Sequence, residues 1–402
     1  MSKVYVVAAK RSALGSFLGT LSNISPAEFG SQVLSKTLEQ SGINPNWIDE
    51  VIIGNVLPAG QKQGLPRQIS IMANIPAEVP AYGVNMICGS GMKSVINGFM
   101  SIKAGLSGLV VAGGVESMSQ APFLVSGNVR SGVKMGNLVF TDYMLTDGLT
   151  DAFENYHMGI TAENIVAKHG LTREMQDDFA YASQVKAKNA QDLGLFDKEI
   201  IPVIIKNKKG DVIFDKDEYI NRTTTREKIG SLRPAFKPDG SVTAASSSGI
   251  NDGASFMVLA NEEMVKLHNL KPLVEIVAVG QAGVDPSVMG LGPVPAITKS
   301  LNQAGLKISD IDTFELNEAF AAQALGVVRE LSENFGVTEK SILDKTNPNG
   351  GAIALGHPVG ASGNRIIVTL IHNMLREESK KLGLASLCIG GGMGTAVILK
   401  KI

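Results

Sequence analysis

The sequence predicts an α/β protein made of two similar halves, with a large insertion in the first half. Three observations lead to this fold class: short runs of consecutive apolar residues, amphipathic helical patterns between these runs, and the same order of elements near both ends of the chain. The 402 residues are enough for roughly two to three domains, each with a sizeable core.

Seven short runs rich in apolar and β-branched residues are predicted to be strands. Their apolar residues are consecutive rather than alternating, which is typical of a sheet covered by helices on both faces. The runs span residues 4–8, 51–53, 109–112, 256–260, 274–279, 313–316 and 396–399. Strands of this kind, alternating with helices, indicate an α/β architecture.

Two segments show clear helical periodicity. Between residues 92 and 103, apolar side chains recur at steps of three and four residues, as on one face of an amphipathic helix. A longer helix is predicted over residues 172–193, where Thr172 is suited to cap the N-terminus and Gly194 to end the helix.

The order of elements repeats along the chain. Near each end, an acidic helix end is followed by a strand, a loop, a helix and a strand that closes on glycines. We interpret this as two duplicated halves, residues 1–120 with 250–271 and residues 272–402. Residues 121–249 hold one amphipathic helix and a charged polar segment, and are predicted to be an inserted loop domain. The alternative is that any α/β protein shows such a likeness without duplication.

Charge and cysteine content exclude several classes of protein. The 38 acidic and 37 basic residues leave a formal charge of −1, which excludes a dedicated nucleic-acid binder and does not support a membrane-surface protein. Two cysteines, Cys88 and Cys388, exclude a disulfide framework and a cysteine-rich zinc module. The sequence has no secretory signal pattern and no apolar run of ~18 residues. We therefore expect a cytoplasmic protein with free thiols and no metal site.

Cys88 lies just before the predicted helix at residues 92–103, in the sequence Cys-Gly-Ser-Gly. Unpaired N–H groups and the positive end of a helix dipole favour the thiolate, which is the nucleophilic form of cysteine. Gly89 and Gly91 allow a tight turn and the close approach of a ligand. The alternatives are an inert buried cysteine, or a dinucleotide-binding loop that lacks its third glycine and its ribose-binding acid.

Two further glycine-rich segments carry reactive side chains. His357 stands between Gly356 and Pro358, in a loop suited to a general base near neutral pH. Cys388 ends a predicted strand and precedes three glycines, whose bare N–H groups suit an oxyanion pocket; a β-bulge is the alternative. Together these residues indicate catalysis by a thiol nucleophile with two acid/base partners.

Six segments, in order along the whole chain, resemble successive motifs of the thiolase family. They are Val84-Asn-Met-Ile-Cys-Gly-Ser-Gly, Ala112-Gly-Gly-Val-Glu-Ser-Met-Ser, Ser248-Gly-Ile-Asn-Asp-Gly-Ala, Asn317-Glu-Ala-Phe-Ala, Gly356-His-Pro-Val-Gly-Ala-Ser-Gly and Cys388-Ile-Gly-Gly-Gly-Met-Gly. The resemblance implies the thiolase fold, in which two βαβαβαββ halves form a five-layered α-β-α-β-α core. It also implies assembly into a homodimer or homotetramer.

The resemblance implies a role for each reactive group. Cys88 is similar to the nucleophile that accepts the acyl group from acyl-CoA as a thioester, and His357 to the base that activates it. Cys388 is similar to the second acid/base, which removes a proton from the methyl group of acetyl-CoA. Asn317 is similar to the residue that, with His357, holds a water in one oxyanion hole. The N–H groups of Cys88 and Gly390 are similar to the second oxyanion hole.

The implied substrates are coenzyme A thioesters, namely acetyl-CoA and acetoacetyl-CoA with free CoA, and no separate cofactor is implied. Ser248 is similar to the serine that meets the pantetheine arm, and Arg222 to a residue near the nucleotide end. Residues similar to those of the tunnel wall are Leu149, His157, Met158, Phe236, Ala244, Ala319 and Phe320. For Met158 and Phe320, ordinary core packing is the alternative.

The His157-Met158 pair is similar to that of short-chain thiolases. The expected reaction is therefore the reversible condensation of two acetyl-CoA to acetoacetyl-CoA and CoA. The alternatives are a 3-ketoacyl-CoA thiolase for longer chains and a thiolase-like acyl-CoA-binding protein without turnover. A ketoacyl synthase is disfavoured, because its Cys-His-His set leaves Cys388 unexplained. The segments Met86-Ile and Ala245-Ser-Ser-Ser-Gly depart from the usual family pattern, which bears on fine specificity only.

Overall fold

The computed structural model describes residues 3–402 and confirms the predicted α/β architecture. Its main sheet has 11 strands, with the path β13-β14-β15-β12-β1-β11-β5-β3-β4 and two short strands paired to β11 and β1. The strands on this path are β1 (Val4–Ser12), β3 (Glu50–Gly54), β4 (Ala81–Val84), β5 (Leu109–Ser117), β11 (Asn251–Asn261), β12 (Val274–Gly283), β13 (Thr313–Leu316), β14 (Leu382–Ile389) and β15 (Met393–Lys401). All seven predicted strands fall within these bounds.

Helices cover the sheet and also form separate parts of the insertion. The α-helices are α1 (Pro26–Gln40), α2 (Leu65–Met72), α3 (Ser90–Lys103), α4 (Met158–His169), α5 (Arg173–Asp192), α6 (Arg226–Gly230), α7 (Glu262–Leu267), α8 (Pro293–Ala304), α9 (Ala321–Phe335), α10 (Glu339–Leu343), α11 (Ala352–Leu355) and α12 (Val359–Arg376). Short 3₁₀ helices span Pro45–Trp47, Gly127–Ser131, Pro286–Leu291 and Ile308–Asp310, and a π-helix spans Met144–Leu149.

The two halves have the same strand pattern. In the first, β3 is parallel to β5, β5 is antiparallel to β11, and β11 is antiparallel to β1. In the second, β13, β14, β15 and β12 repeat this pattern. The first half runs β1-α1-β3-α2-β4-α3-β5-β11, which is the expected βαβαβαββ order. In the second half, a single bridge between Phe314 and Thr346 replaces the strand that corresponds to β4.

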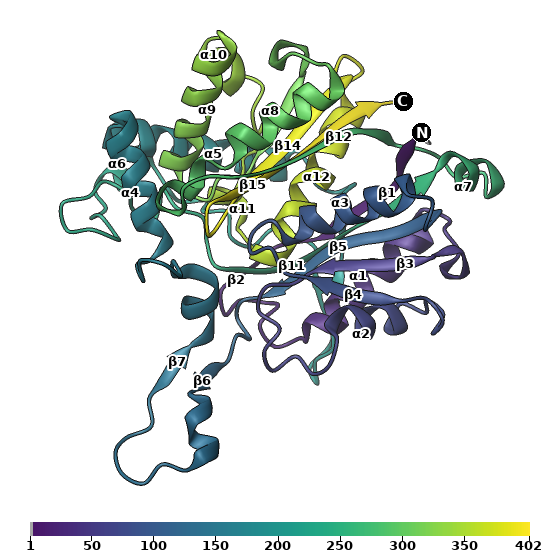
Figure 1. The fold of residues 1–402 in the computed structure, drawn as a ribbon, viewed down its shortest axis with the longest axis horizontal. Coiled ribbons are helices and arrows are strands. Elements are labelled where there is room, and N and C mark those ends of the chain that lie inside the picture. The colour runs from purple at the N-terminus through teal and green to yellow at the C-terminus, as the bar shows by residue number, and fades with distance from the viewer. Residues whose placement is uncertain (1–2) are drawn as a thin grey trace.

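The halves meet along β1 and β12, which pair through Tyr5–Glu275 and Val6–Val274. Helices α3 and α12 lie between the two halves of the sheet, where their apolar side chains share one buried cluster with strands from both (Figure 1). Helices α1 and α2 cover the outer face of the first half, and α8 and α9 that of the second. The expected five layers are therefore present.

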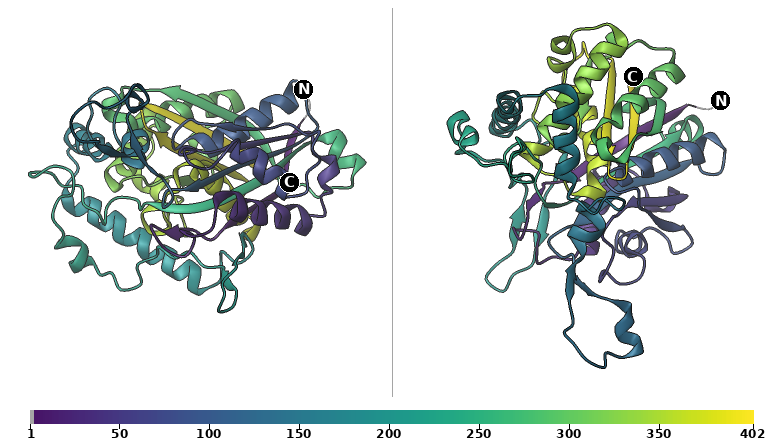
Figure 2. Two further views of the ribbon diagram at one scale, coloured as in Figure 1. Left: turned by 90° about the horizontal axis from the view of Figure 1, so that it is seen from below. Right: turned by 60° about the vertical axis from the view of Figure 1, so that its left-hand side comes forward.

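The chain between β5 and β11 leaves the main sheet, apart from β8 (Ile200–Ile201), which pairs with β1. It includes α5, which starts and stops as predicted: Thr172 Oγ1 accepts from Met175 N (3.2 Å), and Gly194 has a φ of +65°. It also includes α4, which the sequence did not predict. The hairpin of β6 (Phe123–Val125) and β7 (Phe140–Asp142) projects far from the body (Figures 1 and 2).

Candidate active site

A cavity of about 440 Å³ lies where α3 and α12 begin, and its walls are mainly apolar. It brings together eleven of the residues singled out from the sequence: Cys88, Leu149, His157, Met158, Phe236, Ala244, Ser248, Ala319, Phe320, His357 and Gly390. Segments from both halves and from the insertion therefore meet in one site. A mostly apolar pocket with a few converging polar groups is the usual form of a site for an organic substrate.

Cys88 lies in a tight turn between β4 and α3. Ile87 has a φ of +46°, and Ser90 Oγ accepts from Met86 N (2.8 Å) and donates to Ile87 O (2.6 Å), which fixes the turn. Burial raises the pKa of the Cys88 thiol to about 11, although the N–H groups of Gly390 and Cys88 itself point at the sulfur and lower it in part. Backbone N–H groups thus favour the thiolate as expected, but desolvation outweighs them, so Cys88 is a thiol near pH 7 in the free protein.

His357 is held from both sides of its loop. Its backbone N–H donates to Asn251 Oδ1 (2.9 Å), and its Nδ1 lies 2.6 Å from Ser362 Oγ. The Ser362 hydroxyl donates to Pro358 O (2.9 Å), so it accepts from Nδ1–H. Nε2 therefore carries the lone pair, and it is buried without a partner among the described residues.

The imidazole of His357 is neutral near pH 7. Burial, followed by the positive charge of Arg365, lowers the pKa of His357 to about 3. A neutral ring with a free Nε2 in the cavity of Cys88 is suited to accept the thiol proton. The lowered pKa makes His357 a weaker base in the free protein than the one near neutral pH that the sequence predicted, because burial disfavours the charged ring.

Cys388 lies at the end of β14, behind the cavity wall, and is 1% exposed. Burial raises the pKa of the Cys388 thiol above its usual range, and the charge of Cys88 raises it further. Beyond it, Gly391 and Gly392 have φ values of +83° and +86°, in the region that favours glycine. The turn thus directs the Gly390 N–H at Cys88 with no side chain in the way.

Asn317 follows β13 and is 2% exposed. Its backbone N–H donates to Ser386 O (3.0 Å), but neither atom of its side-chain amide has a partner among residues 3–402. A buried amide in this state needs a small polar group beside it. The predicted role of Asn317, the holding of a water, fits this requirement and stays a prediction.

One part of the cavity wall is aromatic. His157 caps α4, where its Nδ1 accepts from Gly159 N (3.0 Å), and its ring stacks on Phe236 at 4.7 Å between centroids. Phe236 in turn meets Phe320 edge to face at 5.9 Å. Burial lowers the pKa of His157, so the stack is uncharged near neutral pH. Met158 and Phe320 line the cavity and also belong to a buried apolar cluster, so the predicted role and its core-packing alternative both apply to them.

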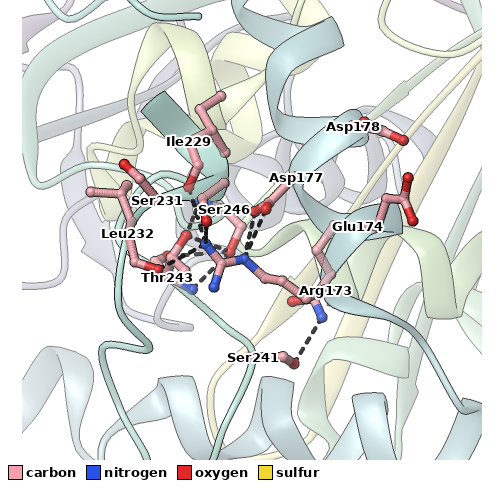
Figure 3. Close-up of polar contacts among 12 residues, drawn as sticks. Arg173, Glu174, Asp177, Asp178, Ile229, Ser231, Leu232, Ser241, Thr243 and Ser246 are labelled. Carbon is pink, nitrogen blue, oxygen red and sulfur yellow. Dashed lines mark hydrogen bonds and ion pairs between the residues drawn. The ribbon is translucent and has the colours of Figure 1, made fainter. Parts of the chain in front are cut away.

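Residues 229–248 form the part of the wall that carries Phe236, Ala244 and Ser248, and Figure 3 shows how the insertion holds it. Arg173 pairs with Asp177 (2.8 Å) and donates to the carbonyl groups of Ile229 (3.0 Å) and Leu232 (2.9 Å). Ser248 N donates to Ala319 O (2.9 Å), which joins this segment to the loop after β13.

Arg222 is the one predicted CoA contact that lies outside the cavity. It is exposed and pairs with Asp192 at 2.7 Å. Cys388 and Asn317 also do not line the cavity, although both lie in the segments that bound it.

The sequence reasoning missed other lining residues. Several of them are direct neighbours of predicted ones, so adjacency was an available signal. Phe17, Tyr219 and Met289 had no local signal, because only folding brings them to the cavity, whereas Met118 lies within one of the six motifs. The missed residues are Phe17, Ile87, Met118, Gly148, Tyr219, Ala235, Ser247, Gly249, Ile250, Met289 and Val359.

Within residues 3–402, no group of three or more His, Cys, Asp or Glu side chains is arranged to hold a metal ion. Across the same residues, none of the helices is long and apolar enough to cross a membrane.

Comparisons with known proteins agree with this geometry. The family profile "Thiolase, N-terminal domain" matches residues 4–263, and "Thiolase, C-terminal domain" matches residues 270–401. A probable acetyl-CoA acyltransferase of Staphylococcus epidermidis is 49% identical over 402 residues, covering 100% of this chain and 99% of the relative. An acetyl-CoA acetyltransferase of Allochromatium vinosum is 49% identical over 400 residues, covering 99% of each chain.

Solved structures give the same result. The acetyl-CoA acetyltransferase of Syntrophomonas wolfei superposes with a TM-score of 0.96 at 42% identity, covering 100% of both chains. Human mitochondrial 3-ketoacyl-CoA thiolase in complex with CoA superposes with a TM-score of 0.92 at 41% identity, covering 100% of this chain and 98% of that one. This chain belongs to the thiolase family and is an acyltransferase.

Proposed function

We propose that this thiolase is an acetyl-CoA C-acetyltransferase, which condenses two acetyl-CoA reversibly to acetoacetyl-CoA and CoA. The observation that carries the proposal is the free Nε2 of neutral His357 in the same cavity as the Cys88 thiol, with two N–H groups aimed at the sulfur. The names of the relatives from Allochromatium vinosum and Syntrophomonas wolfei support the acetyl group as the one transferred.

The first half-reaction acylates Cys88. His357 Nε2 takes the thiol proton, and the sulfur attacks the acetyl carbonyl, so that a carbon–sulfur bond to Cys88 forms and the bond to the CoA sulfur breaks. The proton passes from His357 to the leaving CoA thiolate. We assign the N–H groups of Cys88 and Gly390, which point at the sulfur, to the oxyanion that develops on the adjacent carbonyl oxygen, and one such donor is worth about 2.7–4 kcal/mol.

The second half-reaction makes the carbon–carbon bond. His357 first takes the thiol proton of Cys388, whose thiolate then takes a proton from the methyl group of the second acetyl-CoA, and the carbanion attacks the acetyl carbonyl on Cys88. The carbon–sulfur bond to Cys88 breaks, and its thiolate takes the proton from His357, so that all three groups return to their starting states. Asn317, through a water, and His357 stabilise the enolate oxygen. A covalent intermediate thus divides a difficult exchange into two easier ones.

A 3-ketoacyl-CoA thiolase acting on longer chains is the second candidate, favoured by the likeness to the human mitochondrial enzyme of that name. The test compares CoA-dependent thiolysis of acetoacetyl-CoA with that of a ten-carbon 3-ketoacyl-CoA, with Cys88→Ala as the blank. We expect a clear preference for acetoacetyl-CoA, because the His157-Met158 pair, which is similar to that of short-chain thiolases, lines the cavity beside the ring of Phe236. An equal or higher rate on the longer substrate would replace the first candidate with the second.

We further propose that the chain is cytoplasmic and assembles as a homodimer or homotetramer. The β6–β7 hairpin supports assembly, because it exposes Phe123 (66%), Met135 (94%) and Val139 (74%), and such apolar patches commonly mark interfaces. Light scattering on the purified protein tests the assembly. A monomeric mass would refute it, and a mass that falls after these three residues are changed to Ser would place the interface at the hairpin.

A further inference from the structure

Glu116 is a fully buried acid near the end of β5 that no step of the proposed reaction uses; its exposed fraction is 0%. Its carboxylate accepts four hydrogen bonds. Oε1 accepts from Asn55 Nδ2 (2.9 Å) and Leu57 N (3.2 Å), and Oε2 accepts from Val56 N (2.9 Å) and Gly360 N (2.9 Å). A buried acid with this many donors is a fixed junction between segments.

The four donors belong to two segments that flank the catalytic pair. Gly360 is the second residue of α12 and lies three residues after His357. Val56 and Leu57 follow β3 and pack in one apolar cluster with Val359, the first residue of α12. Cys88 packs against the same cluster. A shift of either segment therefore moves His357 relative to Cys88.

The start of α12 rests directly on β5. A Cβ atom at Gly360 would lie 2.5 Å from Glu116 Oε2, and one at Gly114 would lie 2.3 Å from Gly360 O. Only glycine allows the two backbones this approach. The first N–H groups of a helix have no partner within it, so the carboxylate satisfies one of them and adds favourable negative charge at the positive end of the helix.

The hydrogen bonds also act on the charge of the carboxylate. Burial raises the pKa of Glu116 to about 7, whereas the N–H groups of Val56, Leu57 and Gly360 lower it. Asp252, on the neighbouring strand β11, raises it further. Because the donors favour the ionised form, the junction is strongest when the carboxylate is charged.

We propose that Glu116 is a positioning residue of the thiolase reaction, whose carboxylate holds the Gly360 N–H and thereby fixes His357 opposite Cys88. Glu116 does not line the cavity, so it acts through the start of α12 and not on the substrate. The inference rests on the proposed function, since it assigns His357 the role of base.

The first test is Glu116→Gln, which keeps the size of the side chain but puts an NH₂ group among the four donors. We expect kcat for acetoacetyl-CoA thiolysis to fall about 10²-fold, the cost of a displacement of roughly 1 Å in a catalytic group. KM should change by less than about threefold, because the cavity wall is intact. Loss of folded protein alone also lowers the apparent kcat with KM unchanged, so active sites are counted by titration of Cys88. The value of kcat per active site then falls only if the remaining folded enzyme is impaired.

Asp49→Asn is the matched control at the opposite end of β5. Asp49 Oδ2 accepts from Gly108 N (2.7 Å) and Leu109 N (2.9 Å), so this carboxylate also holds backbone N–H groups, but it lies away from the cavity. We expect Asp49→Asn to retain kcat. Asn55→Ala is a second variant, which removes one donor and leaves Glu116 in place; it should lower kcat in the same direction by a smaller factor.

Hydrogen–deuterium exchange supplies a readout that needs no turnover. In Glu116→Gln, peptides covering residues 357–363 should exchange faster than in the wild type, while peptides covering residues 45–50 should not. Unchanged kcat in both Glu116→Gln and Asn55→Ala would overturn the inference. If the wild type itself does not cleave acetoacetyl-CoA, the proposed function fails. Faster exchange at residues 357–363 in Glu116→Gln would then still support the view that Glu116 holds the start of α12, and unchanged exchange would refute it.

Discussion

The starts of α3 and α12 occupy matching places in the two halves, yet one presents a thiol and the other an imidazole. Helix α3 follows β4 at one edge of the sheet, and α12 follows the segment that bridges to β13 at the other edge. Both helices lie between the two halves of the sheet. Cys88 precedes α3 by two residues, and His357 precedes α12 by two residues. One duplicated position thus supplies the nucleophile in the first half and the base in the second.

The two halves agree in several contacts and strand irregularities that lie away from Cys88 and His357. Asp49 Oδ2 accepts from the N–H groups of Gly108 and Leu109 before β5, and Asp312 Oδ2 accepts from those of Lys381 and Leu382 before β14. Bulges interrupt β1 between Val6 and Ala8, and β12 between Ile276 and Ala278. Features far from the cavity therefore agree between the halves.

The far ends of the same strands differ. Strand β5 closes on Glu116, whose carboxylate takes up four donors and holds the start of α12. Strand β14 closes on Cys388 and the glycines after it, which leave the Gly390 N–H free to face Cys88. The first half thus has a carboxylate that holds a helix, and the second has backbone N–H groups that face the nucleophile. The two halves differ most where the reaction takes place.

The largest expected effect separates the two thiols. Cys88→Ser should lose acylation by acetyl-CoA, whereas Cys388→Ser should still be acylated but should fail to condense, because it lacks the group that takes the methyl proton. Turnover should fall by about 10⁴-fold or more in each, the size of loss seen when a nucleophile or its partner is removed. Intact-mass measurement after mixing with acetyl-CoA checks the acyl group. If the acetyl group were found on Cys388 instead, Cys388 would be the nucleophile and Cys88 the second acid/base.

The second prediction concerns pH. Because the pKa of Cys88 is raised to about 11 and that of Cys388 still higher, the thiolate of Cys88 in the free protein grows about tenfold per pH unit between pH 7 and 10. The rate of alkylation by iodoacetamide, followed by peptide mass spectrometry, should rise accordingly. A plateau near pH 7 would mean that the helix N-terminus outweighs burial after all. Cys88→Ala is the control for reaction at other sites.

A smaller effect is expected at Ser362, the partner of His357 Nδ1 at 2.6 Å. Ser362→Ala removes the acceptor that keeps the proton on Nδ1 and the lone pair on Nε2. A general base contributes about 10²–10⁴-fold, and we expect the loss of part of this, about tenfold in kcat. Ser362→Thr keeps the hydroxyl and should restore most of the rate. Equal activity of the Ala variant would show that the tautomer is set elsewhere.

The sequence predicted the repeated features of the fold better than the contacts between distant segments. Consecutive apolar residues located the strands because a sheet covered on both faces buries both sides of each strand. Thr172 and Gly194 marked α5 because caps act locally. Helix α4 was missed because its N-cap is His157, not one of the residues preferred at that position. Glu116 lies in one of the six motifs, but its contact with Gly360 had no local signal, since the two are 244 positions apart.

Local features of the sequence also revealed the reactive residues. They did not reveal the pKa values of these residues. Glycines beside Cys88, His357 and Cys388 reveal tight turns and close approaches, which are local properties of the chain. The pKa of Cys88 depends on how deeply the folded protein buries the sulfur, which no neighbouring residue indicates. The same limit explains why Arg365, which lowers the pKa of His357, was not singled out.

The smallest expected effect tests the preserved symmetry. Asp49→Asn and Asp312→Asn each weaken a carboxylate that accepts two backbone N–H groups at a strand start, so each should lower the free energy of unfolding by about 1–2 kcal/mol. Urea unfolding of both variants measures the two losses. The two halves pack against one another through α3 and α12, so we expect them to unfold together. Similar losses would indicate that the matching contacts of Asp49 and Asp312 stabilise this one cooperative unit to the same extent. A loss confined to Asp312→Asn would mean that the second half limits unfolding, and that the halves have diverged in stability as well as in chemistry.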